Sequence, residues 1–244
     1  MAARSAGSLS SGDTGDVEVR KTTQVVYVLR DLLYTLALGI FGWVLADFGG
    51  FIAFPLPAVG SFFKDFWNLF FVSLLLFAFG VELVFCPGRI RPSDEVRIPW
   101  RRWKGMLMEA NLVPAIFCAR LDVLQISRAD TIRIIGIFFL AVSMVVTVFY
   151  GVVRSRQIKE SGEDSFSTRG IYRYIRYPEY LAQLLYSLFV ALFFRSCVGL
   201  IVTLLLVRSL VIKTGKLDRS LDQKYLDGWM KYCQTSKRLI PFLI

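Results

Sequence analysis

The 244-residue chain is 55% hydrophobic and carries a formal net charge of +10, yet it contains no histidine. This apolar content exceeds what a water-soluble core requires, so we expect lipid to cover part of the surface. The lack of histidine excludes a Ser-His-Asp triad, a Cys-His dyad and any histidine-ligated metal site.

The positions of the cysteines and of the basic residues exclude further kinds of site and partner. The four cysteines are far apart in the chain and form no CxxC pair, so neither a zinc site nor a disulfide framework is expected. The basic residues lie in the stretches between apolar runs, which favours anionic lipid headgroups as partners over nucleic acid. We therefore predict an integral membrane protein with no metal and no nucleic-acid partner.

Taken in chain order, residues 1–23 are polar and Ser/Gly-rich, and they are expected to form a disordered tail. Clear apolar segments follow at Leu32–Phe48, Phe66–Phe85, Ile132–Val153 and Tyr180–Ile212. The last segment is too long for one pass and is interrupted at Arg195-Ser196, so it predicts a helical hairpin.

The segment Met106–Ala119 is either a full pass or a re-entrant or interfacial helix. If it crosses the bilayer, the basic stretches Gly88–Lys104 and Arg154–Arg176 and the tail after Lys213 all lie on one side, as the positive-inside rule expects. The predicted fold is therefore an all-α polytopic transmembrane helical bundle of about six passes, with both termini cytosolic. Residues 24–131 would hold the N-terminal transmembrane helices and a basic loop, and residues 132–244 the functional core.

The polar segment Ser161–Gln183 precedes the hairpin. Pro178 suits the first position of a helix, and Glu179 complements the positive helix end. The segment's tyrosines have one interpretation as interfacial aromatics. Because Arg173 and Arg176 are interleaved with them, a site for a charged small molecule is the alternative.

The tail Lys213–Ile244 predicts a C-terminal amphipathic helix that lies on the membrane or packs over the preceding loop. Its apolar stripe recurs every four residues, at Leu217, Leu221, Tyr225 and Trp229. By composition, Asp218 is either a solvated surface acid or a ligand.

Two of these segments resemble the isoprenylcysteine carboxyl methyltransferase and phospholipid methyltransferase superfamily. The run GIYRYIRYPEYLA from Gly170 to Ala182 is similar to the family signature G-x-Y-x-x-x-R-H-P-x-Y-x-G. After the hairpin, the run LDRSL from Leu217, then Tyr225, Trp229 and the closing LIPF, resembles the family's E-E-x-x-L…Y…P pattern. The resemblance covers about Ile132 to the C-terminus.

The sequence departs from the family pattern at several positions. Tyr177 stands where the family has histidine, Leu217 and Asp218 where it has two glutamates, Ala182 where it has glycine, and Leu226 where it has glycine. The changes at Tyr177 and Leu217 remove polar groups that, in the family, belong to the cofactor pocket.

The resemblance implies a membrane-embedded methyltransferase that uses S-adenosylmethionine on a lipid or a prenylated-cysteine carboxylate, in the endoplasmic reticulum. The cofactor-binding residues that it implies are Gly170, Tyr172, Arg176, Tyr177, Pro178, Tyr180 and Asp218. Arg176 would pair with the cofactor carboxylate and is the expected catalytic residue, while Asp218 would accept a hydrogen bond from a ribose hydroxyl or the amino group. Methyl transfer to a carboxylate needs no general base, so the lack of histidine does not exclude it.

Two other functions stay open at the level of sequence. The replaced motif positions favour a catalytically inactive relative with a structural or interaction role. Sterol-type membrane reductases end in a similar R-H-P-x-Y segment and use NADPH.

Overall fold

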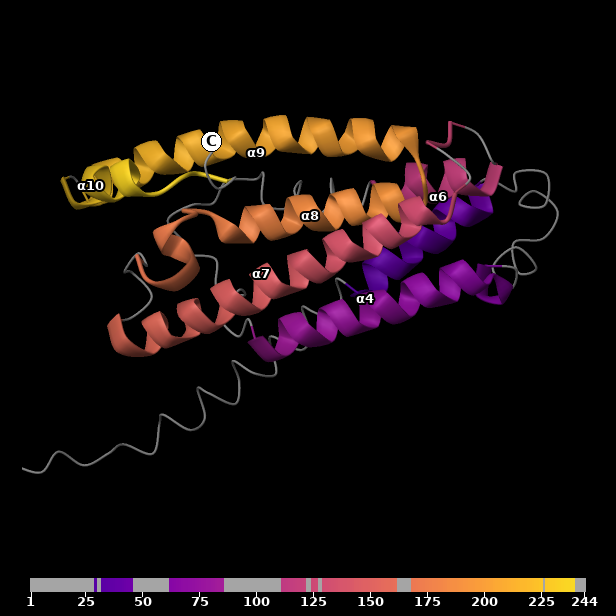
Figure 1. Cartoon of the computed structure of the whole chain (residues 1–244), viewed down its shortest axis with the longest axis horizontal. Helices are drawn as coiled ribbons and strands as arrows, with labels where there is room; N and C mark the ends of the chain where they lie inside the picture. The colour runs from indigo at the N-terminus through magenta and orange to yellow at the C-terminus, as the bar shows by residue number, and fades with distance from the viewer. Residues whose placement is uncertain are drawn as a thin grey trace, which may run out of the picture.

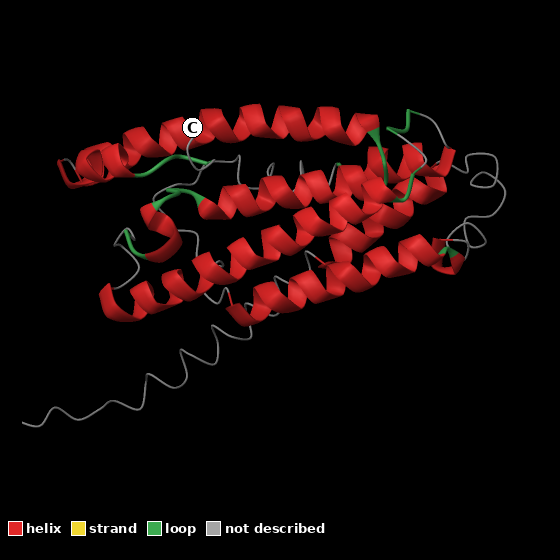
Figure 2. Ribbon diagram, in the orientation of Figure 1, coloured by secondary structure: helices red, strands yellow, loops and turns green. Residues whose placement is uncertain are grey.

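The structure, a computed structural model, describes Leu29 and residues 32–45, 62–85, 111–121, 124–126, 129–161, 168–225 and 227–239. All regular structure in these ranges is helical, with no strand among them, as the sequence predicts (Figure 2). The expected disordered tail and the basic loop Gly88–Lys104 lie outside the described residues.

The bundle consists of long helices that run along its long axis (Figure 1). After a helix at Leu32–Leu45 come α4 (Phe66–Phe85), α6 (Leu112–Leu121), α7 (Thr131–Ser161), η2 (Gly170–Arg173), α8 (Pro178–Phe193), α9 (Cys197–Tyr225) and α10 (Asp227–Thr235). Helix α8 packs against both α7 and α9, and α4 packs on α7. The helices α6 and α10 lie at opposite ends of the bundle (Figure 1).

The predicted hairpin is present, and it turns where the sequence is interrupted. Helix α8 ends at Phe193 and α9 begins at Cys197. Between them Arg195 has a φ of 55°, a left-handed conformation that turns the chain sharply. Ser196 then caps α9, because its Oγ accepts a hydrogen bond from the Gly199 backbone N–H at 3.1 Å.

The main core is aromatic and joins helices from both halves of the chain. Phe71 on α4 packs against Phe189 and Phe193 on α8, with ring centroids 5.7 Å and 5.5 Å apart. Leu112 and Ile116 on α6 belong to the same buried cluster. Residues on both sides of position 131 therefore share one core.

A buried polar clamp ties α6 to the hairpin. Asn111, which is fully buried just before α6, donates through Nδ2 to Ser187 Oγ on α8 at 3.0 Å and to Thr203 Oγ1 on α9 at 3.3 Å. Because a polar group inside an apolar bundle is costly unless it is hydrogen-bonded, these contacts fix the relative heights of three helices.

Two helices among the described residues are long and apolar enough to cross a membrane, over Thr131–Gln157 and Cys197–Gln223. Their outer faces expose large apolar side chains, including Phe138 and Phe149 on α7 and Leu204 on α9. A surface of this kind suits lipid and is rare on soluble monomers.

The expectation of about six passes is not confirmed, because the remaining apolar helical stretches are shorter: Leu32–Leu45, Phe66–Val81, Leu112–Leu121 and Pro178–Phe193. In particular, the described part of Met106–Ala119 consists of Asn111 and most of α6, whose 10 residues extend about 15 Å.

The tail differs from its prediction as well. No separate helix begins at Lys213, because α9 continues without a break to Tyr225 and only then does α10 follow. The residues between Lys216 and Tyr225 include good helix formers and no proline, so nothing ends the helix where the apolar run ends.

Close approach of α7 and α8 depends on Gly136. A Cβ added there would lie 3.0 Å from the Phe193 backbone nitrogen, which cannot move aside without shifting α8. We expect Gly136→Leu to lower the free energy of unfolding by about 1–3 kcal/mol, measured as a lower melting temperature in detergent. Gly80→Leu is the matched control, since outside its own helix backbone no atom of the described residues lies within 4 Å of its added Cβ. Equal melting temperatures for the two variants would contradict this account.

Candidate functional site

The loop before α8 is shaped by Gly170. Its φ of +59° favours glycine, and an added Cβ would lie 2.7 Å from Val153 Cγ2 on α7. The loop therefore lies directly on α7 and leads through η2 to Tyr177, the residue that precedes α8. Pro178 is the first residue of α8 and Glu179 lies in its first turn, as predicted.

A segment that follows α10 pairs with this loop. Arg176 N donates to Lys237 O at 2.7 Å, Lys237 N donates to Tyr174 O at 3.0 Å, and Tyr177 N donates to Arg238 O at 3.2 Å. This short parallel pairing carries the side chain of Arg238 to the end of α9.

These elements converge on Asp218, a buried acid on α9. Its Oδ2 lies 2.6 Å from Arg238 Nε and 3.0 Å from Arg176 Nη1, and its Oδ1 accepts a hydrogen bond from Tyr177 OH at 2.8 Å. Arg176 Nη1 also donates to Cys233 Sγ on α10 at 2.9 Å. We call Arg176, Tyr177, Asp218, Cys233 and Arg238 the Asp218 cluster.

The centre of the Asp218 cluster is buried, and the cluster has an excess of positive charge. The side chains of Arg176 and Asp218 are each 10% exposed, and two guanidinium groups face one carboxylate. Arg176 Nε is buried and has no hydrogen-bond acceptor among the described residues. A buried donor without an acceptor is costly, so this nitrogen is a natural contact for an anionic ligand.

An aromatic wall lies beside the cluster. The ring centroids of Tyr177 and Tyr180 are 5.8 Å apart, and Lys213 Nζ on α9 lies 5.0 Å from the centroid of the Tyr180 ring. A cation at this distance from a ring face is attracted by the ring quadrupole. The Tyr180 ring is therefore placed to hold a positive charge.

Burial keeps the hydroxyls and the thiol of this region protonated at neutral pH. Burial, and then the negative charge of Asp218, raise the pKa of Tyr177 far above its usual range. Burial also raises the pKa of Tyr232 to about 12 and raises the pKa of the Cys233 thiol. Tyr177 is thus a hydrogen-bond donor to Asp218 at neutral pH.

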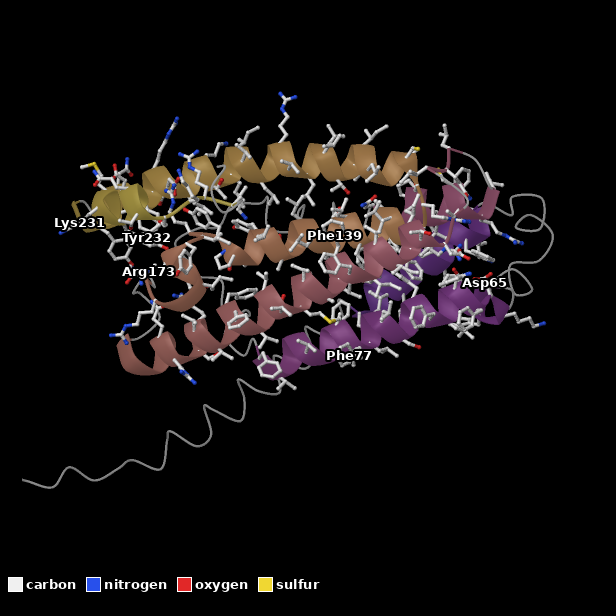
Figure 3. All side chains as sticks on the ribbon, in the orientation of Figure 1. Asp65, Phe77, Phe139, Arg173, Lys231 and Tyr232 are labelled. Carbon is white, nitrogen blue, oxygen red and sulfur yellow. The ribbon has the colours of Figure 1, made fainter. Side chains whose placement is uncertain are left out.

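The residues that the resemblance selected lie together at one end of the bundle, where Figure 3 labels Arg173 and Tyr232. Arg176, Tyr177 and Asp218 are in direct contact, and Tyr180 adjoins Tyr177. The other three shape the loop: Gly170 lies against α7, Pro178 starts α8, and Tyr172 accepts a hydrogen bond through its carbonyl from Tyr232 OH at 2.5 Å. Asp218 is buried, so of its two interpretations the solvated surface acid is wrong.

Sequence reasoning missed Arg238 and Cys233. Arg238 reaches Asp218 because its backbone pairs with the loop before α8, and no local sequence pattern predicts that pairing. Cys233 carries one usable signal, because it lies four residues after Trp229 and therefore beside the buried face of α10.

No protein-family model matches the chain, and no curated protein matches it. The resemblance to the methyltransferases therefore rests on the motif residues and on their meeting at Asp218.

Removing the Tyr177 hydroxyl leaves one oxygen of the buried Asp218 carboxylate without its donor. We expect Tyr177→Phe to reduce the free energy of unfolding by about 1–3 kcal/mol. Tyr174→Phe, at a side chain that is 60% exposed, should change it little. In a double-mutant cycle with Asp218→Asn the cost of Tyr177→Phe should shrink, and strict additivity would show that this hydrogen bond carries no energy.

The Cys233 thiol provides a pH-dependent probe. Since the thiolate is the reactive form and burial raises this pKa, alkylation of a variant that retains only Cys233 should accelerate at a higher pH than alkylation of a free thiol. The rate of maleimide labelling against pH measures this, with the same variant unfolded in dodecyl sulfate as the control. A folded-state profile that coincides with the control would refute the burial argument.

Proposed function

We propose that the protein is a membrane-embedded S-adenosylmethionine-dependent methyltransferase that acts on a lipid or prenylated-cysteine carboxylate. The observation that carries the proposal is the contact at 3.0 Å between Arg176 and Asp218, which joins the two motif segments across the hairpin. Neither segment alone is specific, but their meeting at a buried, charged cluster is what such a cofactor site needs.

The donor set suits the charged end of S-adenosylmethionine, which carries both a carboxylate and an ammonium group. Arg176, with its buried and unsatisfied Nε, would bind the carboxylate, and Asp218 would bind the ammonium group or a ribose hydroxyl. In the structure these two residues pair with each other. Such an ion pair is complementary to a ligand that carries both charges. When the ligand binds, Arg176 would exchange the Asp218 carboxylate for the ligand carboxylate, and Asp218 would exchange the Arg176 guanidinium for the ligand ammonium group.

The tyrosines beside the cluster would hold the sulfonium. Lys213 Nζ lies over the Tyr180 ring, so this ring contacts a positive charge, and the sulfonium would have to replace the lysine ammonium there. Tyr172 lies on the same loop and would pack near the adenosine.

When bound, S-adenosylmethionine would supply an electrophilic methyl group for transfer from its sulfonium to a carboxylate oxygen, and Arg176 and Asp218 would hold its charged end. No proton is released, so the residues need only bind, orient and exclude water. The positive and negative charges of the reactants cancel in this step, and a dry site of low dielectric favours that. The high pKa of Tyr177 is consistent with a reaction that requires no base.

The lipid environment supports an acceptor that enters from the bilayer. The outward apolar faces of α7 and α9 adjoin lipid in this proposal, and both helices lead to the end of the bundle that holds the Asp218 cluster (Figure 1). We further propose about six passes, both termini in the cytosol and residence in the endoplasmic reticulum.

A second candidate is an inactive relative in which the Asp218 cluster is a structural lock. The observation in its favour is that both oxygens of Asp218 already have protein partners, one of them the Tyr177 hydroxyl at the position where the family has histidine.

Calorimetric titration of the purified chain with S-adenosylhomocysteine and with NADPH separates these functions. Binding of the first alone supports the methyltransferase, and binding of NADPH alone supports a sterol-type reductase. If neither binds, the structural lock is the correct function.

Arg176→Ala should weaken S-adenosylhomocysteine binding by about 1.5–3 kcal/mol, since it removes a charged hydrogen bond. Asp218→Asn should have a similar effect through the ribose or ammonium contact. Arg173→Ala is the matched control, because Arg173 lies three residues away on the same loop with an exposed side chain. Unchanged affinity in Arg176→Ala would eliminate the carboxylate role.

A further inference from the structure

A second charged region lies at the opposite end of the bundle, where Figure 3 labels Asp65. A cavity of about 160 Å³ opens there between the helix Leu32–Leu45, α4, α6, α7 and the end of α8. Its charged lining consists of Arg120, Arg133 and Asp65, with Phe193 and Phe194 as part of its apolar floor. None of these residues belongs to the Asp218 cluster.

The two arginines of the cavity are held by aromatic rings. The Arg133 guanidinium carbon lies 4.0 Å from the centroid of the Trp67 ring, and that of Arg120 lies 4.5 Å from the Trp43 ring. A tryptophan face orients a guanidinium but accepts none of its N–H groups in the plane. The planar donor edges are therefore left for other acceptors.

Arg133 has donor capacity that the described residues do not use. Its Nη1 pairs with Asp130 Oδ1 at 3.3 Å, but Asp130 is 63% exposed, so that pair is weak. Its Nε is buried and has no acceptor among the described residues. An oxygen in the cavity would satisfy this nitrogen and recover the cost of its burial.

The charge balance of the lining favours an anion. Two guanidinium groups face one carboxylate, and Asp65 Oδ1 already accepts from the Asn68 backbone N–H at 3.0 Å near the start of α4. Arg133 itself feels the positive charge of Arg195, on the hairpin turn, and the negative charges of Asp130 and Asp65. A tetrahedral oxyanion is the ligand that several guanidinium groups bind best.

We propose that this cavity binds a phosphate group, and that in the membrane the phosphate belongs to the headgroup of an anionic lipid. Exposed apolar side chains next to the cavity residues in the chain, among them Phe66 on α4 and Ile134 on α7, give the acyl chains of such a lipid apolar surface to contact. The size of the cavity matches a headgroup phosphate and excludes a whole lipid.

The test is a fluorescence titration of the full chain in neutral detergent, because Trp43 and Trp67, two of its five tryptophans, contact the two arginines and report on the cavity. The probes are dioctanoylphosphatidylglycerol, inorganic phosphate and uncharged dioctanoylglycerol. We expect saturable binding of the phospholipid that Arg133→Gln weakens by about ten- to a hundred-fold. Arg156→Gln, an exposed basic position on the same helix, should bind as the wild type does.

Arg120→Gln is a second variant for this test in case Arg133→Gln fails to fold. Because Arg120 is exposed, its substitution should leave the core intact. It should also weaken phospholipid binding.

Comparable binding of inorganic phosphate would support the site and identify free phosphate as its ligand. Equal binding of dioctanoylglycerol, equal losses in Arg156→Gln, or no saturable binding by any probe would overturn the proposal. Titration with S-adenosylhomocysteine should be unaffected by Arg120→Gln, which separates this site from the proposed function.

Discussion

The arrangement of the polar end of the bundle depends on one buried carboxylate. Asp218 lies on α9, yet its partners come from the loop before α8 and from the segment after α10. Removing this charge leaves the buried Arg176 and the partly exposed Arg238 without their shared carboxylate, which is more costly than losing a surface ion pair. The Asp218 carboxylate therefore holds together α9, the loop before α8 and the segment after α10. With Arg176 it also presents paired opposite charges that suit a ligand carrying both.

The sequence predicts the helical elements well where a strong local signal exists. The hairpin turn at Arg195-Ser196 and the start of α8 at Pro178 follow from a polar interruption and from a residue that lacks a backbone N–H. The end of the hairpin's second helix was harder to predict, because hydropathy falls after Ile212 although helix propensity does not. The number of passes depends on how short helices pack, and periodicity carries no information on that.

In the candidate site, too, some contacts could be predicted from the sequence and others could not. The contact of Arg176 with Asp218 could be predicted from two motifs and a hairpin between them. The role of the Tyr177 side chain could not, since its ring fills space beside Tyr180 and its hydroxyl reaches Asp218 across the hairpin. Arg238 depends on backbone pairing, and the arginines over Trp43 and Trp67 depend on tertiary contacts between segments far apart in the chain.

Because α9 runs unbroken from Cys197 to Tyr225, the orientation of Asp218 is set by residues more than three turns away. Thr203 anchors the helix against Asn111 and Ser187, and every residue between Thr203 and Asp218 adds about 100° of rotation and 1.5 Å of rise. Inserting a single residue in this interval would swing the carboxylate away from Arg176, whereas inserting about seven residues, close to two full turns, would restore its direction but move it about 10 Å along the axis. The number of residues between Thr203 and Asp218 therefore sets the position of the carboxylate. We expect this part of α9 to tolerate substitutions on its lipid face far better than insertions or deletions.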